Sequence, residues 1–244
     1  MMRKKRRLRR GWLGDVISYA YLTILAAIAA FPLLWILLSS VKSKGELTGN
    51  PTAILPKEIT FDFFKTVLGQ LHFNVNIVNS IIVAGCTTLI AITISALGAY
   101  GVVRFFPKFG KVLTRVLITT YMFPPILLAV PYSIIMGKAG MMNNRVGLII
   151  VYLSFAVPYA VWLLVAVAIY TFINAWNEFL YSLILMNSSD KMTVAVALKS
   201  LGGQEVMDWG VMMAASALVV VPSVVFFMLI QKKIAGGLAQ GSIK

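Results

Sequence analysis

The sequence predicts an all-α membrane protein with six transmembrane helices, one membrane domain over residues 16–244 and both termini in the cytoplasm. Three observations support this fold class: the composition, the charge-free runs and the distribution of basic residues. The 244 residues are 59% hydrophobic and only 12% charged, and their mean hydropathy is +0.87. An average soluble domain carries about twice this share of charge. Because a soluble fold of this size could not bury so much apolar side chain, we expect lipid to surround most of the chain.

Charge-free runs locate the expected helices, since about 20 apolar residues are needed to cross roughly 30 Å of hydrocarbon. Four runs are clear: 16–41, 75–103, 116–137 and 211–231. A fifth uncharged region holds the 32 residues between Arg145 and Glu178, and its apolar character continues to Met186. One helix of that length would be about twice as long as the bilayer core. We therefore expect two helices, 146–164 and 165–187, with hardly any loop between them.

The N-terminus is strongly basic, because seven of the 22 lysines and arginines lie in the first ten residues. This cluster directly precedes an apolar run, so the net charge of +14 indicates a membrane surface and no nucleic-acid partner. We expect residues 1–15 to be cytoplasmic. The run 16–41 could belong to a cleaved signal peptide, but it is much longer than the usual signal core. We interpret it as a retained membrane anchor.

The distribution of basic residues favours six spans over five. With six, the N-terminus, the segment after 75–103 and the C-terminal tail share the cytoplasmic side, which places 14 lysines and arginines inside and 8 outside. A five-span chain would place Lys232 and Lys233 outside, against the positive-inside rule. The long outer segment 42–74 carries turn signals, and its residues 61–65 are expected to form a short helix at the membrane surface.

Three prolines within eight residues mark the run 116–137: Pro124, Pro125 and Pro131. A proline inside a helix removes a backbone hydrogen bond and kinks the helix. These residues are candidates for a kink or gate beside a solute path. The alternative is that they have no special role, because prolines are common in membrane helices.

A polar stripe is predicted on the run 165–187. Asn174, Asn177, Glu178 and Tyr181 follow an i, i+3, i+4, i+7 spacing, which places them on one face of a helix. We regard these four residues, together with Tyr121, as candidates for lining a path. An ionisable group is costly in hydrocarbon, so Glu178 should face protein or water. Alternatively, Glu178 lies near the outer interface or packs against another helix.

The sequence carries no motif that indicates catalysis or metal binding. It has no G-x-x-x-x-G-K-[ST] loop, no H-E-x-x-H and no G-x-S-x-G. Its single cysteine, Cys86, and single histidine, His72, cannot form a metal-ligand cluster. We expect a protein that is not an enzyme, binds no metal and relies on a partner for any use of ATP.

Several short motifs together resemble the inner-membrane permease subunits of binding-protein-dependent ABC transporters, in the carbohydrate group that includes the maltose/maltodextrin type. The resemblance covers nearly the whole chain. In order, the matching residues are Thr60-Phe61-Asp62-Phe63-Phe64, Asn79-Ser80, Ala99-Tyr100-Gly101-Val102-Val103-Arg104, Phe123-Pro124-Pro125, Val130-Pro131-Tyr132, Phe172, Ala175-Trp176-Asn177-Glu178-Phe179 and the tail Gly236-Gly237-Leu238-Ala239-Gln240-Gly241-Ser242-Ile243-Lys244.

The resemblance implies a multi-pass protein of a bacterial or archaeal plasma membrane. It also implies a second homologous permease, two cytoplasmic ATP-binding subunits that hold ATP and magnesium, and an extracytoplasmic sugar-binding protein. This chain would need no cofactor and would share with the second permease the translocation pathway for a sugar or oligosaccharide. Gly237, Gly241 and Lys244 are candidate contacts to the ATPase. The alternative is a stand-alone secondary carrier or channel that uses Glu178 as a coupling acid.

One departure from the resemblance concerns the region near residues 162–165. The family has a cytoplasmic loop there, with a Glu-Ala-Ala…Gly signature, which docks onto the ATPase. Here an apolar run, Trp162-Leu163-Leu164-Val165-Ala166-Val167, occupies its place. Roughly thirty to forty residues are missing, judged by the length of a helical hairpin. We favour a natural polypeptide longer than the sequence printed here over a protein that lacks its coupling loop.

Overall fold

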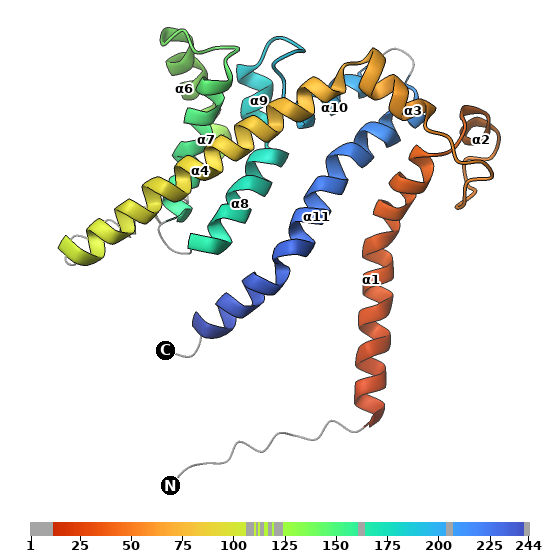
Figure 1. Ribbon diagram of the computed structural model, residues 1–244, viewed down its shortest axis with the longest axis horizontal. Helices are drawn as coiled ribbons and strands as arrows, with labels where there is room; N and C mark the ends of the chain where they lie inside the picture. The colour runs from red at the N-terminus through yellow and green to blue at the C-terminus, as the bar shows by residue number, and fades with distance from the viewer. Residues whose placement is uncertain are drawn as a thin grey trace.

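The computed structural model describes residues 12–105, 124–160, 164–203 and 207–241, together with residues 110, 112, 115, 116 and 119. All regular secondary structure within these ranges is helical. The prediction of an all-α protein is confirmed. Figure 1 shows that the three longest helices approach one another at one end of the molecule and spread apart toward the other.

Three helices are much longer than the others: α1 (Trp12–Ser40), α4 (Phe73–Phe105) and α11 (Trp209–Gly241). Each contains a segment that is long and apolar enough to cross a membrane, and among the described residues no further helix meets that criterion. The segments are Gly14–Ser40, Phe73–Val102 and Trp209–Met228. In Figure 1, α1 meets α11 at the end where the helices converge and then runs away from the rest of the bundle.

Within the described ranges, five shorter helices pack with the long ones: α6 (Pro125–Lys138), α7 (Arg145–Ala160), α8 (Leu164–Asn177), α9 (Leu180–Leu185) and α10 (Val194–Gly202). The uncharged stretch after Arg145 thus contains two helices, α7 and α8, which both pack against α4 (Figure 1). Residues 161–163, which connect them, lie outside the described residues.

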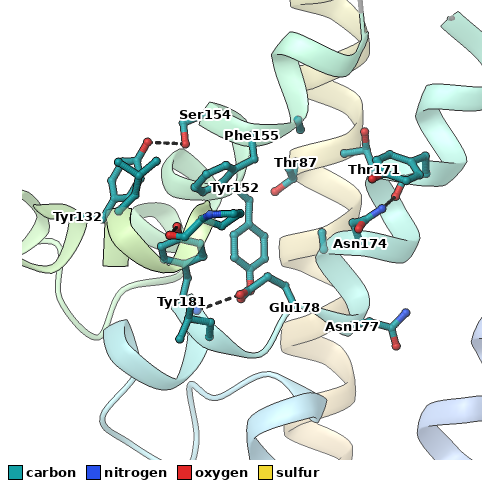
Figure 2. Close-up of a pocket in the computed structure, with 16 residues that line it drawn as sticks. Thr87, Tyr132, Tyr152, Ser154, Phe155, Thr171, Asn174, Asn177, Glu178 and Tyr181 are labelled. Atoms are coloured by element: carbon teal, nitrogen blue, oxygen red, sulfur yellow. Dashed lines mark hydrogen bonds between the residues drawn. The ribbon is translucent and has the colours of Figure 1, made fainter. Parts of the chain in front are cut away.

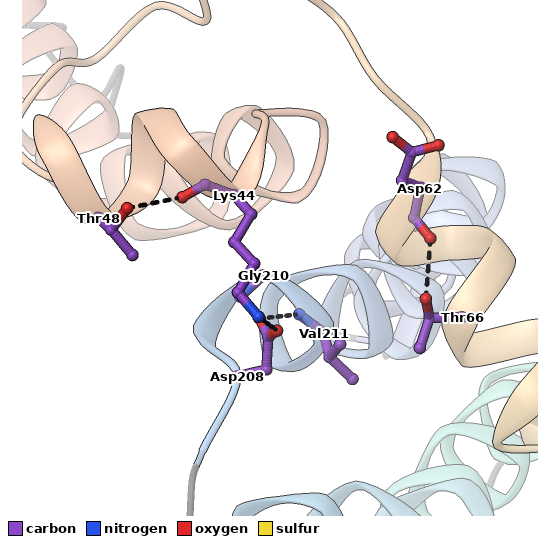
Figure 3. A network of polar contacts seen from close by, with 7 residues as sticks. All are labelled: Lys44, Thr48, Asp62, Thr66, Asp208, Gly210 and Val211. Carbon is purple, nitrogen blue, oxygen red and sulfur yellow. Dashed lines mark hydrogen bonds and ion pairs between the residues drawn. The ribbon is translucent and has the colours of Figure 1, made fainter.

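The segment between α1 and α4 forms a small cap. It contains α2 (Lys44–Gly49), α3 (Asp62–Lys65) and a single π-helical turn, Thr66–Gln70. Figure 3 shows how α2 is joined to the start of α11: the Lys44 ammonium lies 3.1 Å from the Asp208 carboxylate. The same carboxylate accepts the Gly210 amide at 3.0 Å, so Asp208 is the N-cap of α11. The Asp208 side chain therefore caps the N-terminus of α11 and also holds α2 beside it.

The N-terminal half of α4 is held by a polar network. The Asn79 side-chain amide donates to the carbonyls of Asp190 and Met192, at 2.8 and 3.1 Å. Its oxygen accepts the Arg145 guanidinium at 3.1 Å, which links α4 to the start of α7. The Ser80 hydroxyl accepts the Val194 amide at 2.9 Å and so connects α4 to α10. Because Asn79 and Ser80 are almost fully buried, these bonds fix the loop between α9 and α10 against α4.

Candidate functional site

The predicted polar stripe lies at a break between two helices. α8 ends at Asn177, Glu178 and Phe179 are not helical, and α9 begins at Leu180. The prediction of one continuous helix over 165–187 is wrong in this respect. The carboxylate of Glu178 explains the break, because it accepts the Tyr181 amide at 2.9 Å and the Ser182 amide at 3.2 Å. These two amides belong to the first turn of α9, where backbone N–H groups have no helical partner.

Glu178 also joins the break to α7. The Tyr152 hydroxyl donates to Oε2 of Glu178 at 2.5 Å, and Tyr152 is itself buried in the core. The carboxylate therefore has three donors from two helices. A buried or half-buried charge is tolerated when it is bonded in this way. Glu178 packs against another helix, which is the alternative that the sequence left open for it.

Tyr181 is buried, and its hydroxyl donates to the Pro125 carbonyl at 2.6 Å. Its ring packs edge-on against Tyr132, with centroids 5.7 Å apart. It is tilted by 30° against the ring of Phe155, with centroids 5.1 Å apart. Tyr132 and Phe155 also meet at 5.7 Å. Three rings from α6, α7 and α9 therefore form one aromatic cluster, and its polar edge is completed by a hydrogen bond of 2.8 Å from Tyr132 to Ser154.

A cavity of about 460 Å³ lies between this aromatic cluster, α4 and α8. Figure 2 shows Tyr132, Phe155 and Tyr181 on one side and Thr87, Thr171 and Asn174 on the other. Of the predicted site residues, the cavity wall includes Asn174, Asn177, Glu178, Tyr181 and Pro125. Its volume lies within the range typical of small-molecule sites.

Asn174 and Asn177 are both exposed, and each side-chain amide donates to the carbonyl four residues earlier in α8. The fifth candidate for lining a path, Tyr121, lies outside the described residues. Of the candidate ATPase contacts, Gly237 and Gly241 belong to the end of α11, whereas Lys244 lies outside the described residues.

The prolines of the run 116–137 have different positions. Pro124 is the N-cap of α6, with an extended backbone, and Pro125 is its first residue, whereas Pro131 lies inside α6. The first helical position suits proline, since the missing amide has no helical partner there. At Pro124 and Pro125 the structure therefore shows the start of a helix instead of a kink within one. Only Pro125 contributes to the cavity wall.

Sequence reasoning did not identify most of the cavity wall, and the residues it missed include Tyr132, Tyr152, Phe155, Thr87 and Thr171. Each stands in an apolar run where tyrosine, phenylalanine and threonine are common. The only available signal was a polar residue at membrane depth, and that signal does not separate a cavity wall from a helix contact. The hydroxyls of Thr87 and Thr171 are nevertheless unusual, because each is buried without a hydrogen-bond partner.

Several known proteins with similar sequences are permeases of sugar uptake or transport systems. No family model matches the chain. The diacetylchitobiose uptake permease NgcG of Streptomyces coelicolor is 26% identical, over 93% of this chain and 88% of the relative. The trehalose permease SugB of Mycobacterium tuberculosis is 28% identical, over 91% and 95%. The trehalose/maltose permease MalG of Thermococcus litoralis is 27% identical, over 91% and 94%.

The fold is also similar to that of a solved importer. A chain from a bacterial ABC transporter involved in the import of the acidic polysaccharide alginate superposes with a TM-score of 0.70, over 90% of this chain and 96% of that one, at 17% identity. The fold is therefore that of an ABC importer permease. With the sequence similarities, this confirms the resemblance to the carbohydrate group of these permeases. The chain is a transport component of the inner membrane and not an enzyme.

The sequence alignments share a further feature. The alignment with NgcG extends over 268 residues, yet it includes only 93% of the 244 residues of this chain. About forty aligned positions of the relative thus have no residue here. The alignments with SugB and with MalG, each over 263 residues and 91% of this chain, give the same difference.

Proposed function

We propose that this chain is one permease subunit of an ATP-driven importer and that it forms, with a second homologous permease, the translocation pathway for a sugar or oligosaccharide. Two cytoplasmic subunits bind and hydrolyse ATP with magnesium, and an extracytoplasmic sugar-binding protein delivers the substrate. The observation that carries this proposal is the similarity, over nearly the whole length, to permeases of chitobiose, trehalose and maltose uptake systems. ATP binding then shifts the pathway between two states without any catalytic residue in this chain.

The cavity between the aromatic cluster, α4 and α8 supports a translocation pathway that this subunit lines. Asn174, Asn177 and the aromatic face of Tyr181 border it, and the start of α6 at Pro125 closes one side. We assign Tyr121 and Pro131 to the same path, and Gly237, Gly241 and Lys244 to the ATPase contact. The assignment of the ATPase contact follows from the sequence resemblance alone.

The arrangement of Glu178 argues against a stand-alone secondary carrier. A coupling acid must exchange a proton or ion with solvent during each cycle. Here the carboxylate instead accepts three hydrogen bonds and caps α9. Purification of the chain from native membranes tests the two functions. Copurification of a nucleotide-binding subunit supports the importer, whereas proton-driven uptake by the chain alone, abolished by Glu178→Gln, would support the carrier.

We further propose that the forty residues present in the relatives belong between α7 and α8. The two helices have 16 and 14 residues, which correspond to about 24 and 21 Å, less than the roughly 30 Å of hydrocarbon. α7 runs beside α4 from Asn79, which bonds to Arg145, to Ser95, whose hydroxyl lies 3.5 Å from the Val157 carbonyl.

Beyond Ser95, α4 continues for ten residues, or about 15 Å, and none of its described side chains there is buried. The facing ends of α7 and α8, at Ala160 and Leu164, would therefore lie inside the membrane, well before the end of α4. The missing residues would lengthen α7 and α8 to match α4 and would form the loop that docks onto the ATPase.

Intact mass spectrometry of the protein from native membranes tests this placement. A polypeptide several kilodaltons heavier than 26.8 kDa, with the extra residues between Ala160 and Leu164, is the expected result. A mass of 26.8 kDa would mean that the shortened form is the natural one. In that case we expect sugar transport to be uncoupled from ATP hydrolysis.

A further inference from the structure

A second cavity, of about 540 Å³, lies where α1, the cap and the start of α11 meet. Its wall includes Trp35 of α1, Phe63 of the cap, and Trp209 and Met213 of α11. The apolar spans of α1 and α11 end at Ser40 and begin at Trp209. The cavity therefore lies at the level where hydrocarbon gives way to lipid headgroups, and tryptophan is typical of that level.

This cavity carries one positive and one negative charge at its rim. Among the lining residues that the structure describes, the charged ones are Lys44 and Asp208, whose ammonium and carboxylate lie 3.1 Å apart (Figure 3). The Lys44 side chain is 75% exposed, and the ion pair uses one of its three N–H donors. Asp208 uses Oδ1 to accept the Gly210 amide, and its Oδ2 retains a lone pair beside Lys44. The rim thus offers donors to an anionic group and an acceptor to a cationic group directly beside it.

The rest of the wall has little polar capacity. Leu47, Met207, Met213 and the aromatic rings supply most of its surface. The Thr48 hydroxyl, which also lines the cavity, already lies 3.0 Å from the Lys44 carbonyl of its own helix. A molecule that fits this cavity would have an apolar body and both charges at one end.

The walls of the cavity are held in place without the ion pair. The ring of Phe63 lies so close to the backbone of Gly210 that a Cβ at this position would overlap the ring. The Lys42 side chain is fully buried, donates to the Ala53 carbonyl and lies 5.2 Å from the centre of the Trp35 ring. These contacts join the cap to both α11 and α1, so a change at the exposed Lys44 should leave the shape of the cavity intact.

The space next to the cavity also suits an acyl chain. Away from the cap, α1 runs away from α11 (Figure 1), and apolar side chains of α1 such as Ile28 and Leu34 are exposed. Surfaces of this kind need a cover of lipid or protein. An acyl chain that begins in the cavity could continue along α1 and supply part of that cover.

We propose that this cavity binds one phospholipid with an ethanolamine headgroup. The lipid phosphate contacts the Lys44 ammonium, the ethanolamine ammonium contacts the Asp208 carboxylate, and one acyl chain lies between α1 and α11. A glycerol headgroup would leave Asp208 beside a phosphate without a compensating cation, which is unfavourable. A choline headgroup has no N–H to donate to Asp208. The inference goes beyond the proposed function, because it concerns a lipid of the membrane and not the transported solute.

Native mass spectrometry of the protein purified from native membranes, with any subunits that copurify, tests the proposal. We expect one phosphatidylethanolamine to remain bound through detergent exchange. After complete delipidation, titration with phosphatidylethanolamine and phosphatidylglycerol of the same acyl chains compares the two headgroups. Phosphatidylethanolamine should bind about threefold to tenfold more tightly, through one additional hydrogen bond between charged groups. Equal affinities, or tighter binding of phosphatidylglycerol, would overturn the proposal.

Two variants assign the two charges to the two parts of the headgroup. Asp208→Asn keeps a side-chain oxygen that can cap α11 but removes the negative charge. It should weaken phosphatidylethanolamine binding and abolish the preference over phosphatidylglycerol. Lys44→Gln should weaken both lipids about threefold to tenfold, because both carry the phosphate. A preference that persists in Asp208→Asn would overturn the proposal.

The matched control is Lys65→Gln. Lys65 also belongs to the cap, is 77% exposed and pairs with Asp62 at 3.0 Å, but it does not line the cavity. Both lysine variants should keep the unfolding temperature of the unmodified protein, since exposed ion pairs contribute little. Lys65→Gln should also keep both lipid affinities. Equal losses of lipid affinity in the two lysine variants would overturn the proposal, because they would indicate unspecific attraction of lipid to a basic surface.

A third variant tests the apolar part of the cavity. Met213 is partly exposed on α11 and lines the cavity, so Met213→Trp should fill part of the space without changing either charge. It should weaken both lipids and leave their ratio unchanged. Full lipid affinity in this variant would overturn the proposal. Loss of all bound lipid from the protein when it is purified together with its partner subunits would also overturn it and would assign the cavity to a protein interface.

Discussion

The two halves of α4 are packed very differently. Up to Ser95, α4 is covered by α7, α8 and α10, and residues such as Val83, Ala84 and Ala91 are almost fully buried. Beyond Ser95, Leu97 and Tyr100 are more than half exposed, although the helix continues to Phe105. The sequence is apolar along both halves, so hydropathy does not distinguish them. The side chains of α4 are therefore buried only along the part of the helix that lies beside α7 and α8, up to the end of α7 and the start of α8.

The difference between the two halves of α4 indicates where the missing residues would lie. In the first half, buried amides and hydroxyls of α4 bond to neighbouring segments, which is how polar side chains stabilise contacts between membrane helices. In the second half, the exposed side chains other than Arg104 are mainly apolar and need a cover of lipid or protein. We expect that cover to come from the extended ends of α7 and α8 and from the loop between them.

The largest effect is expected when the residues missing between α7 and α8 are restored, because they should cover the end of α4. In a Cys86→Ala background, Tyr100→Cys should react quickly with a lipid-soluble maleimide, because this position is 61% exposed. Insertion of the corresponding forty residues of a relative between Ala160 and Leu164 should slow labelling about tenfold, since the side chain becomes covered. It should also restore copurification of the ATPase. Unchanged labelling of a folded insertion variant would contradict the proposed cover.

Leucine truncation should distinguish the two halves by stability. Leu148 on α7 is fully buried against α4, and Leu148→Ala should cost about 3 kcal/mol of unfolding free energy by leaving a cavity. Leu97 is 68% exposed, and Leu97→Ala should change that free energy by less than about 0.5 kcal/mol. Unfolding in mixed micelles measures both. Similar losses for the two variants would mean that the end of α4 is already packed.

The polar network around Asn79 should contribute slightly less to the unfolding free energy than the buried side chain of Leu148. Asn79→Ala removes bonds to two carbonyls and to Arg145 and should destabilise the protein by about 2 to 3 kcal/mol. Asn74, at the start of the same helix, is exposed, so Asn74→Ala serves as the control and should be nearly neutral. If Asn79→Ala were equally neutral, the loop between α9 and α10 would be held by other contacts.

The smallest expected loss of unfolding free energy comes from removing the Tyr152 hydroxyl. Tyr152→Phe removes the bond to Glu178 and should cost about 1 to 2 kcal/mol, since hydrogen bonds to a charged group exceed those between neutral groups. Tyr100→Phe keeps its edge contact with Phe105 and should cost less than about 0.5 kcal/mol. A loss for Tyr152→Phe no greater than for Tyr100→Phe would show that the link between α7 and the break is not stabilising.

The sequence predicted the helical class, the positions of the long helices and two helices after Arg145, because these depend on hydropathy and length. It did not predict the break at Glu178, where no proline or glycine interrupts the run. That break depends on a carboxylate that caps α9 and bonds to Tyr152, a tertiary contact that helical spacing does not reveal. For the same reason, the spacing placed Asn174 and Asn177 on one helix face but did not indicate that Tyr132 and Phe155 line the same cavity.

Sugar-dependent ATP hydrolysis tests the central claim most directly. The complete complex is purified from native membranes, with this chain at the length at which the cell makes it, and is reconstituted into vesicles with the sugar-binding protein. We predict that a sugar stimulates ATP hydrolysis and that the stimulation is lost when this chain is omitted. Stimulation that persists without the chain would contradict its role as a permease subunit.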